Sequence, residues 1–431
     1  MVVAQIIMGL TIVLMVSGKV PIYLTAFVGS VIAALAAGVG VAPGFMFGAM
    51  GGTAMFDANG NPLFLANLLA AGLNPVILDM LGVLLFIGIM EKVGFLNAIV
   101  VKIMHFGNKV GGGPGVCTAG GIAAGIIGGM TGFTQPAITG VITGPPAVDM
   151  GVDKNKVAGV LAHAGHLGNF GGFTHPTMVA VIATAGITFG AINVFGAIVA
   201  LSIFAASYIR LQKDMKNVKD KKELSTDITT DIPFLKAITP FIVLVVAFII
   251  GIPVVVSGLL AAFIVILITG KDFIEGEKTM MAGLTRIIVP LFATASFLFM
   301  SRVIAEIGLV TLFSNLLEPI LAISPILIML LVSSLAGFFT QSNAASIPII
   351  IPFLLIVLDQ GANPLAAAVA AAGGPAIMQY YLTGGPVAAL STVIPVIEGS
   401  DLKAANKFQR PSIWVGMAVL FVICLVLSVV L

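Results

Sequence analysis

Three histidines, His163, His166 and His175, lie close together in a glycine-rich stretch of an otherwise apolar segment, residues 157–185. Imidazole changes charge near neutral pH, so each is a candidate to carry a coupling proton or to donate to a carboxylate. The alternative is that each histidine bonds a backbone carbonyl freed where the segment breaks. No Asp, Glu or Cys joins the three in this stretch, so a metal site is not expected.

Two other apolar stretches, residues 113–149 and 325–358, are interrupted by polar residues. Lipid cannot solvate such backbone, so we expect two re-entrant hairpins whose tips line a protein-covered cavity. The N-termini of half-helices attract anions, and freed carbonyls and hydroxyls suit Na⁺. The alternative is a pair of kinked packing helices whose Ser and Thr side chains bond back to the backbone.

Two long segments follow these hairpins, residues 157–185 and 364–395. As one helix the first would be about 43 Å long, which exceeds a hydrocarbon core of about 30 Å. Glycines and prolines predict breaks between His163 and Pro176 and, in the second segment, at residues 373–379 and 383–386. Two broken helices facing two hairpin tips would form a polar centre near the membrane midplane.

The candidate substrate- and ion-binding residues are the hydroxyl and amide side chains at these tips and breaks. They are Thr134, Gln135, Thr139, Asn169, Thr174, Thr340, Gln341, Ser342, Asn343, Ser346, Gln379 and Thr383.

The composition places these elements in a membrane. Hydrophobic residues make up 59% of the chain and charged residues 9%, against roughly 25% charged residues in a soluble domain. A soluble protein of this size could not keep its surface wettable, whereas lipid solvates apolar side chains directly. No basic run suits nucleic acid. The predicted fold class is an all-α integral membrane protein with about ten transmembrane helices plus the two hairpins.

The chain divides near its middle at a polar connector. We expect a first repeat over residues 1–209, a cytoplasmic linker over 210–235 and a second repeat over 236–431. The predicted spans are 4–18, 22–39, 76–91, 157–185 and 188–209, then 236–251, 254–269, 287–301, 364–395 and 412–431. Residues 41–75 are assigned to an interfacial region.

The basic residues give the orientation. With the connector in the cytoplasm, all 20 lysines and arginines except Arg302 fall on the cytoplasmic side, as the positive-inside rule requires. Five crossings per half is an odd number, so the second half is predicted to be inverted and both termini to lie outside. Arg302 is expected at the surface.

Weak internal similarity supports the two repeats. Residues 86–94 (FIGIMEKVG) resemble 300–308 (MSRVIAEIG), and residues 132–135 (GFTQ) resemble 337–341 (GFFTQ). Aligned without gaps from Gly151 and Gly361, Pro176 meets Pro386. Inverted repeats are typical of secondary transporters, because two equivalent halves can exchange conformations.

Acidic residues are missing from the predicted centre of every span. A cation/proton antiporter usually binds its cation and proton at buried carboxylates, so a neutral centre with helix N-termini fits an anionic substrate better. A channel is disfavoured because repeated hairpins and broken helices are more than a pore requires. An intramembrane enzyme is the least expected class, because the chain has no Gly-x-Ser-x-Gly or His-Glu-x-x-His motif.

The hairpins and breaks resemble those of the ion transporter superfamily, which includes citrate and lactate permeases and the large membrane subunit of TRAP transporters. Residues 86–90 (FIGIM) resemble citrate–metal symporters, 132–138 (GFTQPAI) with 169–172 (NFGG) are similar to lactate permeases, and 340–346 (TQSNAAS) resemble the superfamily's hairpin tip. Where related families carry Ser-Asn-Thr in both tips, this chain has Thr-Gln-Pro in the first. The resemblance implies an elevator motion and a homodimer.

The sequence therefore predicts a non-enzymatic secondary transporter of the plasma (inner) membrane, which carries a small organic carboxylate. Coupling to a Na⁺ or H⁺ gradient is expected, and no cofactor. The alternatives are a cation/proton antiporter and the membrane subunit of a binding-protein-dependent, TRAP-like carrier.

Overall fold

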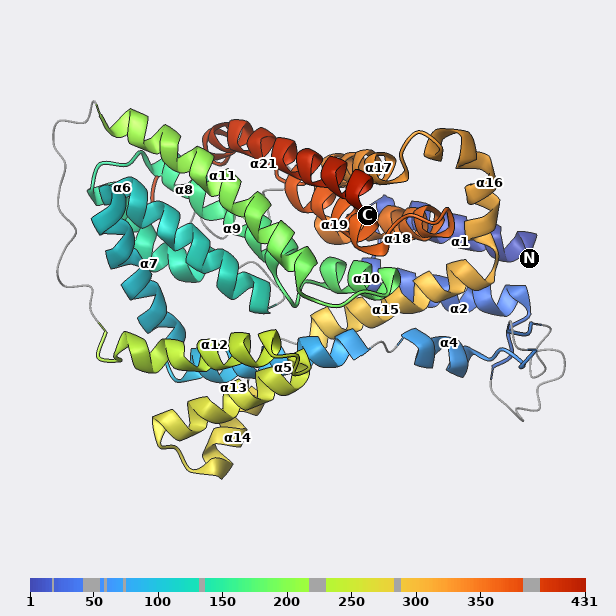
Figure 1. Ribbon diagram of the computed structural model, residues 1–431, viewed down its shortest axis with the longest axis horizontal. Coiled ribbons are helices and arrows are strands. Elements are labelled where there is room, and N and C mark those ends of the chain that lie inside the picture. The colour runs from blue at the N-terminus through green and yellow to red at the C-terminus, as the bar shows by residue number, and fades with distance from the viewer. Residues whose placement is uncertain are drawn as a thin grey trace.

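The computed structural model describes residues 1–17, 19–41, 55–57, 60–72, 75–131, 136–216, 230–282, 288–382 and 396–431. Within these ranges the chain is almost entirely helical, and its only extended pairings are isolated bridges between Gly40 and Phe64 and between Phe56 and Pro62. The helices lie along one elongated body, with the N-terminus at one end and α6, α7 and α8 gathered at the other (Figure 1).

The helices of the first half follow the predicted spans closely, and α4 and the first part of α6 are additional. They are α1 (Val2–Val16), α2 (Ile22–Ala37), α4 (Leu65–Gly72), α5 (Pro75–Lys92), α6 (Phe95–Thr131), α7 (Pro136–Asp149), α8 (Lys154–Ala162), α9 (Ala164–His166), the π-helix η1 (Leu167–Gly171), α10 (Pro176–Ala185) and α11 (Ala191–Met215).

In the second half, α14 and α16 are additional to the predicted spans and hairpin. Its helices are α12 (Phe234–Ile249), α13 (Val254–Thr269), α14 (Phe273–Met281), α15 (Ile288–Glu306), α16 (Leu309–Leu321), α17 (Pro325–Thr340), α18 (Asn343–Asp359), α19 (Pro364–Met378) and α21 (Leu402–Val430).

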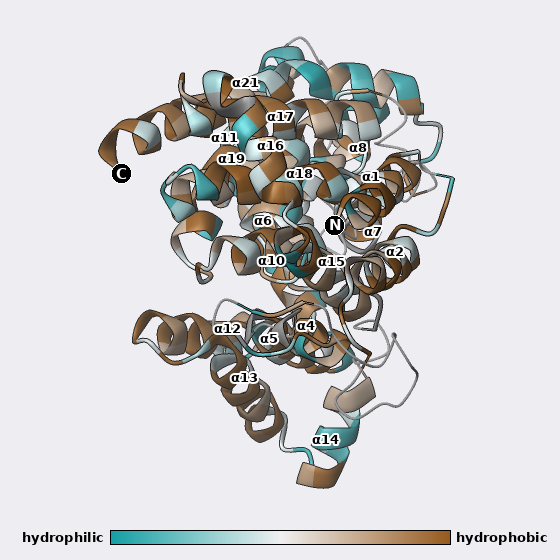
Figure 2. Cartoon of the chain, turned by 90° about the vertical axis from the view of Figure 1, so that its right-hand side faces the viewer, coloured by the Kyte–Doolittle hydropathy of each residue, from teal (hydrophilic) through white to brown (hydrophobic). Residues whose placement is uncertain are grey.

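The chain is a helical membrane protein, as its composition indicates. Among the described residues α6, α11 and α21 are long and apolar enough to cross a bilayer, and the bent pair α15–α16 adds up to one more span. Figure 2 shows apolar residues along most helices and a concentration of hydrophilic residues at α14. Many of the remaining apolar helices have 10–17 residues, so the predicted number of crossings is neither confirmed nor contradicted.

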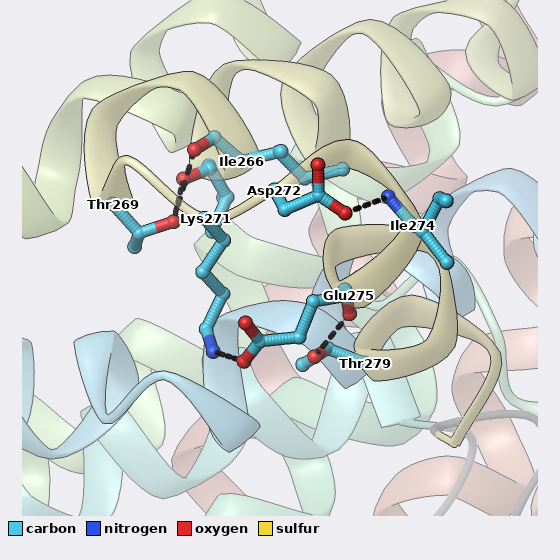
Figure 3. A network of polar contacts seen from close by, with 8 residues as sticks. Ile266, Thr269, Lys271, Asp272, Ile274, Glu275 and Thr279 are labelled. Carbon is cyan, nitrogen blue, oxygen red and sulfur yellow. Dashed lines mark hydrogen bonds and ion pairs between the residues drawn. The ribbon is translucent and has the colours of Figure 1, made fainter.

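The polar corner between α13 and α14 is held by local contacts. Asp272 caps α14 by accepting from the amide of Ile274 at 3.0 Å, and Lys271 pairs with Glu275 one turn away (Figure 3). Thr279 donates to the carbonyl oxygen of Glu275 at 2.7 Å. This corner was predicted to face the cytoplasm.

Equivalent corners of the two halves have the same local structure. Gly151 and Gly361, the residues from which the halves align, both have a positive φ, of 94° and 79°. Two residues after each glycine, Asp153 and Asn363 cap α8 and α19 by accepting from the second and third amides beyond them. This agreement supports a repeat, while the inversion of one half relative to the other stays a prediction.

Helices of each half pack against helices of the other half. α2 and α4 of the first half pack on α15, whereas α13 and α14 of the second half pack on α5, and α11 lies beside α21. The α5–α13 contact brings backbones together, because a Cβ placed on Gly82 would lie 2.5 Å from the carbonyl oxygen of Val255. Small residues at helix crossings allow this approach in membranes.

The long α6 consists of two helices with a kink between them. Gly111 and Gly112 have non-helical backbone angles, and Gly112 has a φ of 58°. The arm after the kink runs to Thr131, α7 starts at Pro136, and the predicted tip between them, residues 132–135, lies outside the described residues. The kink adjoins residue 113, where the first hairpin was predicted to start.

One predicted break is wrong in position. The helix α19 continues through Gly373, Gly374 and Pro375 to Met378, although these residues were expected to unwind it. The glycines serve packing instead, since a Cβ on Gly374 would lie 2.2 Å from Oγ of Ser333 on α17. Close helix contact and helix breaking use the same residue type, so the sequence pattern did not separate them.

Candidate functional site

The tip between α17 and α18 is a compact turn of polar side chains. Oγ of Ser342 caps α18 by accepting from the amide of Ala345 at 3.3 Å. Oγ1 of Thr340 lies 2.8 Å from Oγ of Ser346 and donates to the carbonyl oxygen of Ala336. Gln341 has a φ of 52°, a rare conformation outside glycine. These contacts fix the start of α18.

Asn343, the first residue of α18, joins this tip to both neighbouring segments. Its backbone amide donates to Oε1 of Gln379, just beyond the end of α19, at 2.9 Å. Its side-chain Nδ2 lies 3.4 Å from Nδ1 of His175, at the start of α10. The two segments that were predicted to face the tip therefore meet at one residue. We define Asn343, Gln379 and His175 as the tip centre.

The tip centre has an unused hydrogen-bond acceptor. Asn343 is 3% exposed, and its Oδ1 has no hydrogen-bond partner within the described part of the chain. A buried carbonyl without a partner costs about 1–3 kcal/mol, and such a group in a native structure calls for an explanation, such as a bound ion or water or a functional role. An amide can present either its oxygen or its nitrogen, so this position suits a cation, a hydroxyl or a carboxylate.

The break in the first long segment is shorter than predicted. Helical structure continues from α8 through η1, and the extended part comprises residues 172–175. The carbonyl oxygen of Gly129, near the end of α6, accepts from the amides of Phe173 (2.7 Å) and Thr174 (3.2 Å) and from Oγ1 of Thr174 (3.0 Å). Thr174 is thus bound to the first hairpin arm and not to the tip centre.

Asn193 at the start of α11 was missed by the sequence reasoning. Its Nδ2 donates to the carbonyl oxygens of Gly171 (3.3 Å) and Gly172 (2.7 Å), which the break leaves without helical partners. Its Oδ1 accepts from the amide of Gly190 at 2.9 Å. A buried amide at the start of an apolar helix was the available signal.

His163 and His166 form a separate, fully buried pair, with ring centroids 5.3 Å apart. Nε2 of His163 lies 2.8 Å from Oγ of Ser207, which in turn donates to Ser412. Nδ1 of His166 donates to the carbonyl oxygen of Ala376 at 3.2 Å. The other ring nitrogen of each histidine has no hydrogen-bond partner among the described residues. We call these two residues the buried histidine pair.

Asn169 and Tyr380 lie between the two groups. Nδ2 of Asn169 donates to the hydroxyl of Tyr380 at 3.2 Å, and the Tyr380 ring packs edge-on against His166 with centroids 4.6 Å apart. The backbone oxygen of Tyr380 accepts from Asn406 on α21 at 2.8 Å. Tyr380 and Asn406 were not predicted, although both are polar groups in apolar surroundings.

The side chains of four predicted site residues lie outside the described part of the chain. Thr134, Gln135 and Thr383 lie outside the described residues, and only the backbone of Thr139 is described, within α7. Groups of three or more His, Cys, Asp or Glu side chains able to hold a metal are absent from the described part of the chain.

The fold is shared with solved transporters. The YdaH transporter of Alcanivorax borkumensis, which is described as having an unusual topology, is similar with a TM-score of 0.62 and 15% identity, over 97% of this chain and 98% of that chain. MtrF of Neisseria gonorrhoeae, described as illuminating a class of antimetabolite efflux pumps, gives a TM-score of 0.58 and 12% identity, over 97% and 94% of the two chains.

Sequence comparisons identify no family for this chain. No protein-family model matches the chain, and no curated protein sequence matches it significantly. The structural likeness therefore establishes a fold shared with these two proteins. It does not single out the ion transporter superfamily or a TRAP subunit.

Proposed function

We propose that this protein is a secondary active transporter that carries a small organic carboxylate across the inner membrane, coupled to a Na⁺ or H⁺ gradient. The fold that it shares with YdaH and MtrF supports a transporter. The observation that carries the proposal is the tip centre, where the N-terminus of α18 meets the end of α19 and the start of α10 through Asn343.

The tip centre suits a small anion for two reasons. The N-termini of α18 and α10 both lie there, and each carries a partial positive charge of about half an elementary charge. The side chains of the tip centre are two amides and an imidazole, and none of the hydrogen bonds of Asn343 and Gln379 involves an acidic side chain. A bound carboxylate therefore meets no negative charge in these contacts. The free amide oxygen of Asn343 suits a Na⁺ ion or a substrate hydroxyl.

Transport would require this centre to face the two sides of the membrane in turn. In the proposed elevator motion, the hairpins and broken helices move together against α2, α5, α13 and α15, and the protein is a homodimer. Both termini would lie outside and the linker, residues 210–235, in the cytoplasm.

Three alternatives to this proposal can be distinguished. A cation/proton antiporter needs a buried carboxylate; Asp79 is partly buried, but it caps α13 by accepting from the amide of Val255 at 2.9 Å, away from the tip centre. Extrusion of a substrate is favoured by the likeness to MtrF. A TRAP-like subunit would additionally need a binding protein.

Proteoliposomes test the proposal directly. Purified protein is reconstituted, and uptake of labelled lactate, citrate and succinate is measured with Na⁺ and pH gradients imposed separately and in both directions. Gradient-driven accumulation of one acid is expected. Failure of every acid under every gradient would refute the carboxylate assignment, and Na⁺–proton exchange without any acid would support the antiporter.

A further inference from the structure

One face of α21 carries a row of basic residues followed by an aromatic one. Lys403, Lys407, Arg410 and Trp414 are spaced by four, three and four residues, which places them on the same side of a helix. Lys403, Lys407 and Trp414 are exposed and Arg410 is partly exposed. The end of α21 that bears the lysines is predicted to lie in the cytoplasm.

Arg410 is held in place without a carboxylate. Its Nε donates to the carbonyl oxygen of Tyr381 at 3.1 Å and to Oδ1 of Asn406 at 3.2 Å, and its guanidinium lies over the Tyr381 ring. Trp414 donates from Nε1 to the hydroxyl of Tyr381 at 3.3 Å. Among the described residues, no acidic side chain pairs with Arg410, Lys403 or Lys407, whereas Lys271 at the α13–α14 corner has Glu275 (Figure 3).

An apolar groove continues from this row between α17 and α21. It has a volume of about 450 Å³ and is lined by residues that include Leu331, Leu335, Phe338, Trp414, Met417 and Phe421. The α17 residues that line it, Leu327 to Phe339, extend over about 18 Å at the helical rise. This length is close to one leaflet of a hydrocarbon core about 30 Å thick.

We propose that this groove and the basic row bind an anionic phospholipid. One acyl chain lies in the groove, the phosphate lies against Arg410 and Lys407, and Trp414 occupies the level of the membrane interface. The charge of the row selects the occupant, because basic residues next to the cytoplasmic leaflet attract anionic headgroups. Tryptophan is enriched at membrane interfaces, which agrees with the place that the proposal gives Trp414. This site is independent of the tip centre and of the proposed transport activity.

The only tryptophan in the chain is Trp414, which makes it a specific reporter. The full-length protein is reconstituted in phosphatidylcholine vesicles, and its fluorescence is quenched with increasing fractions of brominated phosphatidylglycerol or brominated phosphatidylcholine. Brominated phosphatidylglycerol should quench at clearly lower fractions. The K403Q/K407Q variant should reduce this preference, by about fivefold for each lysine, and the preference should fall in high salt. Arg410 is left unchanged because it also bonds Tyr381.

K271Q is the matched control, since Lys271 is also predicted to face the cytoplasm but already has an acidic partner. It should leave the lipid preference intact. Equal quenching by both lipids, in the wild type and in the variants, would overturn the proposal in favour of an unselective lipid shell. The absence of quenching by either lipid would also overturn it, and would show that protein, such as a second copy of the chain, covers the groove.

Discussion

The tip centre and the buried histidine pair are built from similar groups but differ in their surroundings. Both contain polar atoms without hydrogen-bond partners among the described residues. His163 and His166 are 0% exposed and lie in the middle of helical segments that contact α11 and α19. Asn343 and His175 lie at helix starts, and His175 is partly exposed. A ligand can therefore reach the tip centre with less rearrangement than the buried histidine pair. An unpaired polar atom indicates a binding site only where a ligand can also reach it.

The largest expected effect is at the tip centre. Asn343→Ala removes the free acceptor and the contact with His175 but retains the backbone bond to Gln379. Transport in proteoliposomes should fall by about 5- to 150-fold, the equivalent of a buried hydrogen bond of 1–3 kcal/mol, with normal membrane insertion. Asn61→Ala, the same change in an exposed turn, is the control. Wild-type rates in Asn343→Ala would place the substrate elsewhere.

The close backbone contact beside the break gives the next effect, on stability. A Cβ at Gly172 would lie 2.2 Å from the carbonyl oxygen of Gly168 and 2.4 Å from Cα of Gly129, both of them backbone atoms. We expect Gly172→Ala to destabilise the fold by about 1–3 kcal/mol, visible as a lower thermal unfolding temperature in detergent. Gly9→Ala, whose Cβ would meet no atom within 4 Å, should be neutral. Equal unfolding temperatures for the two variants would show that the first hairpin arm is not packed against the break.

The histidines can be compared through the pH dependence of uptake. If the proton is carried at the tip centre, His175→Gln should flatten the pH dependence of uptake, while His166→Gln preserves it. The opposite result would assign the proton to His166, which the sequence also indicated. Uptake should be measured with a saturating Na⁺ gradient, so that loss of substrate binding is not mistaken for loss of titration.

The smallest effect on transport is expected at the buried histidine pair. Ser207→Ala removes the partner of Nε2 of His163 and should lower stability by about 1–3 kcal/mol without changing the apparent substrate affinity. Ser202→Ala, on the same helix but bonded only to its own helix backbone, is the control. A changed affinity or pH profile in Ser207→Ala alone would join the buried pair to the transport pathway.

Several elements could be predicted because their signals are local. Apolar runs placed α1, α2, α5, α12, α13 and the start of α11 within a few residues of their observed bounds. The break predicted between His163 and Pro176 contains the non-helical residues 172–175, and the polar tip predicted at residues 340–346 contains the turn between α17 and α18. Helix periodicity and the cost of exposing polar backbone to lipid depend on neighbouring residues, so one sequence carries this information.

The sequence by itself determined that this chain is a helical membrane protein and where its apolar segments stop, because composition and hydrophobic length are properties of the chain alone. Only the tertiary structure decided that Gly374 packs against α17 and that Asn343 contacts His175 and Gln379. It also decided that Thr174 and Asn193 donate hydrogen bonds to backbone carbonyl oxygens at and beside the break. These contacts join residues far apart in the chain, and the same residue type serves a break, a helix crossing or a binding site according to which helix lies opposite.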